Sequence, residues 1–219
     1  MDHLSGRQGH SPHEVDAGQW VFTGDMQDRG RFDARCAWCR KADLRITFEV
    51  RQAVADPTCH VCQVCMGRGT VQVEQNGRLL EGAERNSHVS ELVMRLMHRT
   101  CRDVLRDLMA RSDDPALPEI AVYFDRNLQL SPGHAATLLL ALAKSGLDAD
   151  PAIFAVQLRS TAHRLEFADL SEREKLALWP VLSPAIRNRL IWLGFAPQRY
   201  ATPRQPGARL RPARLPAFS

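Results

Sequence analysis

The first part of the chain carries the hydrophobic patterns of short β-strands. Residues 44–50, LRITFEV, alternate apolar and polar positions and contain β-branched and aromatic side chains, which predicts a strand. Residues 70–82, TVQVEQNGRLLEG, predict two short strands joined at Asn76-Gly77, a dipeptide that accepts the positive φ angles of a tight hairpin turn. We therefore expect a β-rich module over residues 18–82.

After this module the apolar positions recur with the period of a helix. The segment 87–112 places apolar side chains on one broad face: Val89, Leu92, Val93, Leu96, Val104 and Leu108. Arginines fall together on another face: Arg95, Arg99, Arg102 and Arg106. We expect only Asp103 and Asp107 to relieve the repulsion between these arginines, and only in part. Residues 83–116 are assigned to this amphipathic helix and to a linker rich in helix breakers.

Local start and stop signals predict further helices. Two serine–proline pairs place an N-cap residue before proline at the first helical position: Ser131-Pro132 and Ser183-Pro184. Ser171 and Glu174 have the spacing of a capping box. Two glycines suit the C-terminal ends of helices: Gly146 and Gly194. The sequence thus predicts a compact helical domain over residues 117–198, and an α+β fold for the whole chain.

The two ends of the chain lack periodic patterns. Residues 1–17 are polar and are expected to form a disordered tail. Residues 199–219 contain five arginines, several prolines and no acid, which indicates a flexible basic tail. No apolar run approaches the ~20 residues that span a bilayer, and the start of the chain has no signal-peptide pattern. We expect a cytoplasmic protein without a membrane partner, whose thiols stay reduced.

The strongest chemical signal is a pair of cysteine clusters inside the β-rich segment. One Cys-x-x-Cys turn can bind a metal ion with two thiolates. Two such turns that bind the same ion complete a closed tetrahedral shell. We favour a structural Zn²⁺ site with the ligands Cys36, Cys39, Cys62 and Cys65. Cys59 and His60 are alternative donors, because the second cluster holds more donors than one ion needs.

Other interpretations of these cysteines stay open at this point. They are unliganded thiols, a redox pair, an iron–sulfur cluster and a catalytic zinc. A catalytic zinc needs an open coordination position and usually a nearby acidic base. Asp56 lies close in sequence, but no His-x-Glu or Glu-x-x-His signature accompanies it. We therefore expect no enzymatic activity, and we interpret Cys101 as an ordinary core cysteine.

Residues 20–65 resemble a pattern of small bacterial and phage proteins of unassigned function. In that pattern Trp-x-x-Thr-Gly leads to a Cys-x-x-Cys turn, a Leu-Arg strand and a final cysteine. The matching residues are Trp20, Thr23, Gly24, Cys36, Cys39, Leu44, Arg45 and Cys65. This chain departs from the pattern by carrying Cys59 and Cys62, which leaves the third and fourth ligands open. The resemblance implies a zinc module and no particular activity.

A shorter resemblance lies within the second cluster. Residues 62–69, CQVCMGRG, are similar to the Cys-x-x-Cys-x-Gly-x-Gly repeat in the cysteine-rich domain of J-type co-chaperones. The two glycines are expected to let the backbone turn tightly round the metal. The chain has one such repeat where that family has several, so the resemblance implies a type of zinc knuckle and no chaperone function.

Arginine supplies nearly all the positive charge of a chain whose formal net charge is +4. The planar guanidinium suits phosphate, although a GC-rich genome would also favour arginine. Together with Arg187, Arg189 and the basic tail, the helical arginines make three basic elements. A solvated helix face is the more common reason for such a row of arginines, and the alternative is a surface for phosphate or for an acidic partner. In the phosphate interpretation these elements would contact a nucleic-acid backbone and provide no readout of base sequence. We interpret the aromatic residues near the last helix as packing anchors: Trp179, Trp192 and Phe195.

Two functional hypotheses follow. The first is a non-enzymatic, zinc-binding protein associated with nucleic acid, acting as a regulator encoded by a bacterium or a mobile element. The alternative is a protein–protein adaptor whose helical domain binds a partner, with a purely structural zinc. Salt dependence separates them, because phosphate binding weakens steeply as salt rises.

Overall fold

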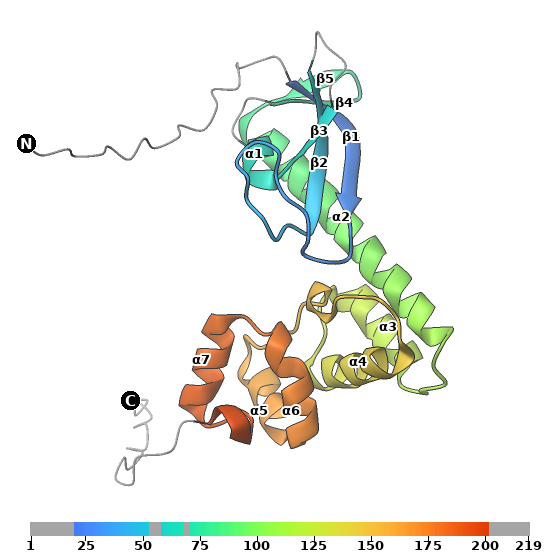
Figure 1. Ribbon diagram of the computed structural model, residues 1–219, viewed down its shortest axis with the longest axis vertical. Helices are drawn as coiled ribbons and strands as arrows, with labels where there is room; N and C mark the ends of the chain where they lie inside the picture. The colour runs from blue at the N-terminus through green and yellow to red at the C-terminus, as the bar shows by residue number, and fades with distance from the viewer. Residues whose placement is uncertain (1–19, 53–57, 68–70, 202–219) are drawn as a thin grey trace, which may run out of the picture.

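A computed structural model describes residues 20–52, 58–67 and 71–201 (Figure 1). Five strands form one mixed sheet in the order β3-β2-β1-β4-β5. Their bounds are β1 (Trp20–Asp28), β2 (Ile46–Gln52), β3 (Thr58–Val61), β4 (Val71–Gln75) and β5 (Arg78–Leu80). β1 pairs antiparallel with β2 and parallel with β4, while β2–β3 and β4–β5 are antiparallel pairs.

The local strand predictions are confirmed with one shift. The predicted strand at 44–50 becomes β2 at Ile46–Gln52, because Leu44 instead makes an isolated bridge with Ala34. The hairpin turn is where the sequence places it: Asn76 has φ 53° and Gly77 has φ 76°. Positive φ angles at both central residues are typical of the tight turns whose twist matches that of the flanking strands.

Helices and the loops between them make up most of the rest of the described chain. Their bounds are α1 (Gln63–Gly67), α2 (Gly82–Met109), α3 (Leu117–Asn127), α4 (Pro132–Ser145), α5 (Thr161–Asp169), α6 (Glu172–Leu178) and α7 (Pro184–Leu193). Three short 3-10 turns connect or end them: η1 (Pro151–Ile153), η2 (Trp179–Val181) and η3 (Gln198–Tyr200).

The predicted helix caps are confirmed. Three serine hydroxyls accept a hydrogen bond from a first-turn backbone N–H: Ser131, Ser171 and Ser183. Glu174 completes the capping box by accepting from the backbone N–H of Ser171. Gly146 and Gly194 both adopt the left-handed conformation at a helix C-terminus. These helix ends are therefore encoded within a few residues of sequence.

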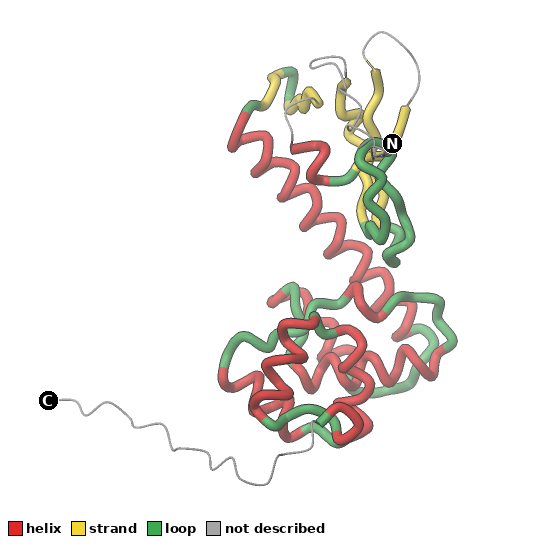
Figure 2. The backbone as a smooth tube through the Cα atoms, turned by 60° about the vertical axis from the view of Figure 1, so that its left-hand side comes forward, coloured by secondary structure: helices red, strands yellow, loops and turns green. Residues whose placement is uncertain are grey.

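Helix α2 runs from the sheet to the helical part (Figures 1 and 2) and contributes side chains to two separate hydrophobic cores. It begins at Gly82, five residues before the predicted start, and is 28 residues long. Near its first turns Val89 packs in a core formed with the sheet, whereas Leu105 and Leu108 pack in the core of the helical part. The single apolar face predicted from the sequence is thus divided between two cores along its length.

The larger core surrounds α4, which packs against α3, α5 and α6. Leu138 in the middle of α4 is fully buried. The helical part extends to η3, where the ring of Tyr200 stacks on Trp179 at 5.2 Å between centroids. The tail predicted at 1–17 lies outside the described residues. The tail predicted at 199–219 lies outside them from residue 202 onward.

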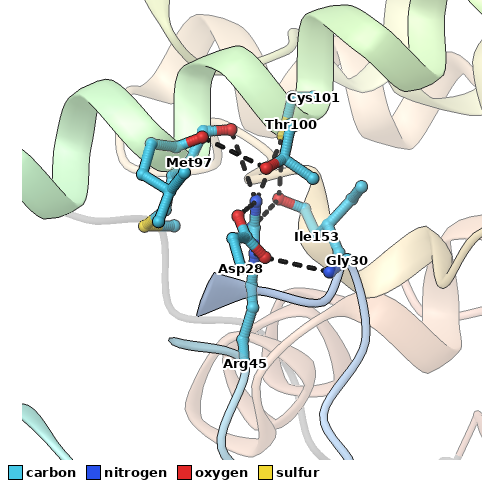
Figure 3. A network of polar contacts seen from close by, with 8 residues as sticks. Asp28, Gly30, Arg45, Met97, Thr100, Cys101 and Ile153 are labelled. Atoms are coloured by element: carbon cyan, nitrogen blue, oxygen red, sulfur yellow. Dashed lines mark hydrogen bonds and ion pairs between the residues drawn. The ribbon is translucent and has the colours of Figure 1, made fainter. Parts of the chain in front are cut away.

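A buried ion pair within the sheet part holds a guanidinium that also bonds to the helical part (Figure 3). Nη2 of Arg45 lies 2.7 Å from Oδ2 of Asp28, and their side chains are 5% and 0% exposed. The same guanidinium donates to the carbonyl oxygen of Ile153 at 2.9 Å and of Met97 at 3.3 Å. Its Nη2 also lies 3.7 Å from Sγ of Cys101. Burial alone would lower the pKa of Arg45, but the contact with Asp28 outweighs it and raises that pKa.

The structure confirms an α+β fold in which a small mixed sheet precedes a mostly helical part. The parallel pairing of β1 with β4 was not predicted, since nothing local in either strand specifies it. Among the described helices, none has both the length and the apolar character that a bilayer crossing needs.

Candidate metal centre

Four cysteine side chains meet beside the sheet. The sulfur atoms of Cys36, Cys39, Cys62 and Cys65 all lie within 4.8 Å of one another. Sγ of Cys36 is 3.7 Å from Sγ of Cys65, and Sγ of Cys39 is 3.6 Å from Sγ of Cys62. These distances are far too long for disulfide bonds, for which S–S is ~2.05 Å. The four thiols are therefore free, and they are the four that the sequence analysis favoured as metal ligands.

The connection between β1 and β2 positions the first cysteine pair. The N–H of Cys36 donates to the carbonyl of Lys41 at 2.9 Å, and the N–H of Arg40 donates to the carbonyl of Cys36 at 3.1 Å. The N–H of Ala37 donates to the carbonyl of His60 at 2.9 Å. The last bond ties this turn to β3, which carries the second pair to the same place.

The second pair follows directly from β3. Cys62 comes immediately after the strand, and Cys65 lies in α1. The backbone N–H of Cys62 points at Sγ of Cys36 at 3.3 Å, the kind of contact that stabilises a thiolate. The sequence predicted a tight glycine turn here, but Cys62 is followed by the short helix α1. Gly67 ends α1, and Gly69 lies outside the described residues.

The geometry of the four sulfurs fits one metal ion. A tetrahedral centre with metal–sulfur bonds of ~2.3 Å has sulfur atoms ~3.8 Å apart. The two measured separations, 3.6 Å and 3.7 Å, match that value closely. An all-thiolate tetrahedral donor set is one that zinc and iron bind. The site could therefore hold a single ion with four protein ligands.

The surroundings affect the four thiols unequally. A backbone hydrogen bond at Lys41 lowers the pKa of Cys39, at the surface, to about 7. Burial raises the pKa of Cys62 and of Cys65 above the ordinary value for a thiol. Buried thiols resist ionisation because a charge in an apolar environment is poorly solvated. A bound cation would remove that resistance by compensating the thiolate charges.

The alternative donors lie outside this cluster. Cys59 sits on β3 opposite Val50, and burial raises the pKa of its thiol. His60 pairs with Glu49 across the strands, where its Nε2 lies 3.9 Å from the carboxylate and its Nδ1 lies 3.4 Å from the Thr47 hydroxyl. Neither residue joins the group of four sulfurs.

The four arginines predicted on one face of α2 line a groove between α2 and α3 of about 610 Å³. More acids accompany them than the sequence analysis expected. The ion pairs are Arg95–Glu91 at 3.8 Å, Arg102–Asp125 at 3.2 Å, Arg106–Asp103 at 2.8 Å and Arg106–Asp107 at 3.9 Å. Glu91 precedes Arg95 by four residues, and this spacing is visible in the sequence. Asp125 lies on α3, so only the tertiary structure brings it to Arg102.

The arginines predicted near the C-terminus lie elsewhere. Arg187 and Arg189 are both on α7, and Arg189 lines a second hollow that shares no residue with the α2–α3 groove. The expectation that three aromatic residues are packing anchors is wrong for one of them. Trp179 is buried and Phe195 packs against the core, but Trp192 is 84% exposed. On a helix this short, periodicity alone did not separate the buried positions from the exposed ones.

Comparison with protein-family models, with curated proteins and with solved structures finds no match for this chain. The resemblances noted in the sequence therefore remain predictions, and the functional argument rests on the residues themselves.

Proposed function

We propose that this chain is a non-enzymatic zinc-binding protein that associates with nucleic acid through the α2–α3 groove. The role of the zinc is structural. The observation that carries the nucleic-acid part is the row of four arginines along one wall of that groove. A regulatory role in a bacterium or a mobile element remains a prediction of the sequence analysis.

The structural role of the metal is supported by the completeness of its ligand shell. Four thiolates fill a tetrahedral centre, so no coordination position remains for water or substrate. The ligands come from two connections on either side of β2 and β3, and a bound ion would cross-link them. The core of the sheet is small, and small cores commonly need such a cross-link to fold stably.

The arginine row suits a nucleic-acid backbone in geometry. Arg95 and Arg106 are three turns apart on α2, so the row spans ~16 Å along the helix axis. Arg99 has no acidic partner among the residues that the structure describes. Each guanidinium can donate two parallel hydrogen bonds to one phosphate.

The neighbouring carboxylates reduce the positive charge of the arginine row only in part. Arg102 and Arg106 are 59% and 69% exposed, and exposed ion pairs are worth ~0–1 kcal/mol. Phosphate can therefore replace a carboxylate at little cost. The acids Asp103 and Asp125 in the same groove also favour a second candidate, a protein partner that presents both charges.

The test compares binding of labelled DNA and RNA by the wild-type chain and by the double variant Arg99→Gln/Arg102→Gln. The control is Arg51→Gln, which removes an exposed arginine on β2, in the other part of the chain. We expect the double variant to bind more weakly and its salt dependence to be shallower by ~0.9 per lost phosphate contact on a duplex. Wild-type protein that binds neither DNA nor RNA at low salt would refute the nucleic-acid proposal and favour the protein partner.

A further inference from the structure

A second basic hollow lies between α5 and α7 and has no acid in its lining. It measures about 330 Å³, and its lining residues are Leu158, Arg159, Arg164, Ala185, Ile186, Arg189 and Leu190. Leu158 and Leu190 are buried and form an apolar floor. The hollow thus combines an apolar floor with three guanidinium groups and no carboxylate, whereas the α2–α3 groove contains acidic residues.

The arginines of this hollow have no carboxylate partner in the part of the chain that the structure describes. Within the described residues, Arg164 donates only to uncharged oxygens, at 2.9 Å to the hydroxyl of Thr161 and also to the backbone carbonyl of Arg159. These bonds hold its guanidinium in place without reducing its charge. Neither Arg159 nor Arg189 forms an ion pair among the described residues. Three cations round one concavity repel one another unless an anion joins them.

An exposed tryptophan stands on α7 beside Arg189, outside the set of residues that line the hollow. Trp192 lies three residues after Arg189 on α7, and residues with this spacing are neighbours on a helix surface. Its side chain is the most exposed of the large apolar residues in the described chain, at 84%. A flat aromatic ring in water next to arginines is the arrangement on which an unpaired base stacks.

We propose that the α5–α7 hollow binds single-stranded nucleic acid. One phosphate enters the hollow between Arg159, Arg164 and Arg189, and the adjacent base stacks on Trp192. This inference rests on the proposed function and adds the form of nucleic acid to it. In a duplex the bases are already stacked on one another, so Trp192 gains a partner only when the strand is single.

The experiment measures fluorescence polarisation of a labelled thymidine oligonucleotide of about 15 nucleotides and of a duplex of equal length. The variants are Trp192→Ala, Trp192→Phe and Arg189→Gln, with Arg51→Gln as the charge-matched control on β2. Trp192 and Arg189 are exposed, so these substitutions should leave the fold intact. Circular dichroism checks that point for each variant.

We expect Trp192→Ala to weaken single-strand binding about ten-fold and to leave duplex binding unchanged, because only unpaired bases stack on the ring. Trp192→Phe should retain most of the affinity, since it keeps an aromatic face. Arg189→Gln should make the salt dependence of single-strand binding shallower by about 0.7, the value for one lost phosphate contact.

Other outcomes would overturn this inference. Equal weakening of single-strand and duplex binding by Trp192→Ala would show that the site does not distinguish the two forms. Unchanged binding by Trp192→Ala and Arg189→Gln, alongside weaker binding by Arg99→Gln/Arg102→Gln, would refute this site and leave the proposed function standing. Binding of a phosphoserine peptide without binding of either oligonucleotide would refute both and assign the hollow to a phosphoprotein.

Discussion

Replacing Arg45 with methionine tests whether its buried guanidinium holds the two parts together, since it pairs with Asp28 in the sheet part and donates to Ile153 in the helical part. Methionine is unbranched, apolar and uncharged, so the substitution removes the guanidinium while keeping the aliphatic part of the side chain. It leaves the carboxylate of Asp28 buried without its cation, and it leaves the carbonyl oxygen of Ile153 with only the weak thiol donor of Cys101. Both consequences destabilise the folded state and leave the unfolded state unaffected.

The expected magnitude follows from the burial of the pair. An exposed ion pair contributes ~0–1 kcal/mol, whereas breaking a buried one by removing a single partner costs ~3–5 kcal/mol. The side chains of Arg45 and Asp28 are 5% and 0% exposed, so the larger value applies. A typical domain has a free energy of unfolding of ~5–15 kcal/mol, so the loss is a large fraction of the total.

The assay is urea unfolding followed by two signals. Far-UV circular dichroism reports mainly on the helices. Tryptophan fluorescence reports on both parts, because Trp20 and Trp38 pack together beside the sheet and Trp179 is buried in the helical core. We expect one coincident transition for the wild-type chain and separated transitions for Arg45→Met. The matched control is Arg31→Met, which breaks an exposed pair with Asp148 that also joins the two parts. Its cost should be ~0–1 kcal/mol.

A second variant separates the ion pair from a mere loss of packing. If the unpaired charge causes the damage, the double variant Arg45→Met/Asp28→Asn should be more stable than the sum of the two single effects predicts. The reasoning would be refuted if Arg45→Met cost no more than Arg31→Met and if its two unfolding signals remained coincident.

The other predictions concern the metal centre and the turns. Cys36→Ser should abolish zinc retention after chelator washing, measured by atomic absorption, while Cys59→Ser should keep the wild-type zinc content; equal losses would contradict the four-sulfur assignment. Gly77→Val should destabilise the fold by ~1–2 kcal/mol in urea, because φ there is 76° and a β-branched residue resists positive φ. Ser171→Ala should cost ~1 kcal/mol at neutral pH by the same assay. Hydrogen bonds from Ser171 lower the pKa of Glu174 on folding, so their stabilisation is present at neutral pH and is lost as pH falls through that lowered pKa.

The sequence alone was enough for features that depend on a few consecutive residues. The serine caps at 131, 171 and 183 accept hydrogen bonds from amides three residues away, so the local sequence is enough to predict them. The Asn76-Gly77 turn is equally local, because it depends on which residues tolerate positive φ. Two Cys-x-x-Cys pairs on either side of a strand were also sufficient to anticipate a four-sulfur cluster, since antiparallel return of the chain brings the pairs together.

Only the tertiary structure decided the features that join distant segments. Arg45 appears in the sequence as one residue of a strand, and nothing near it shows that Asp28, Met97 and Ile153 will surround its guanidinium. Likewise Trp179 is buried and Trp192 is exposed, although both stand in or beside apolar helical stretches. The physical reason is that burial and ion pairing depend on which surfaces pack against each other, and that packing is settled by the chain as a whole.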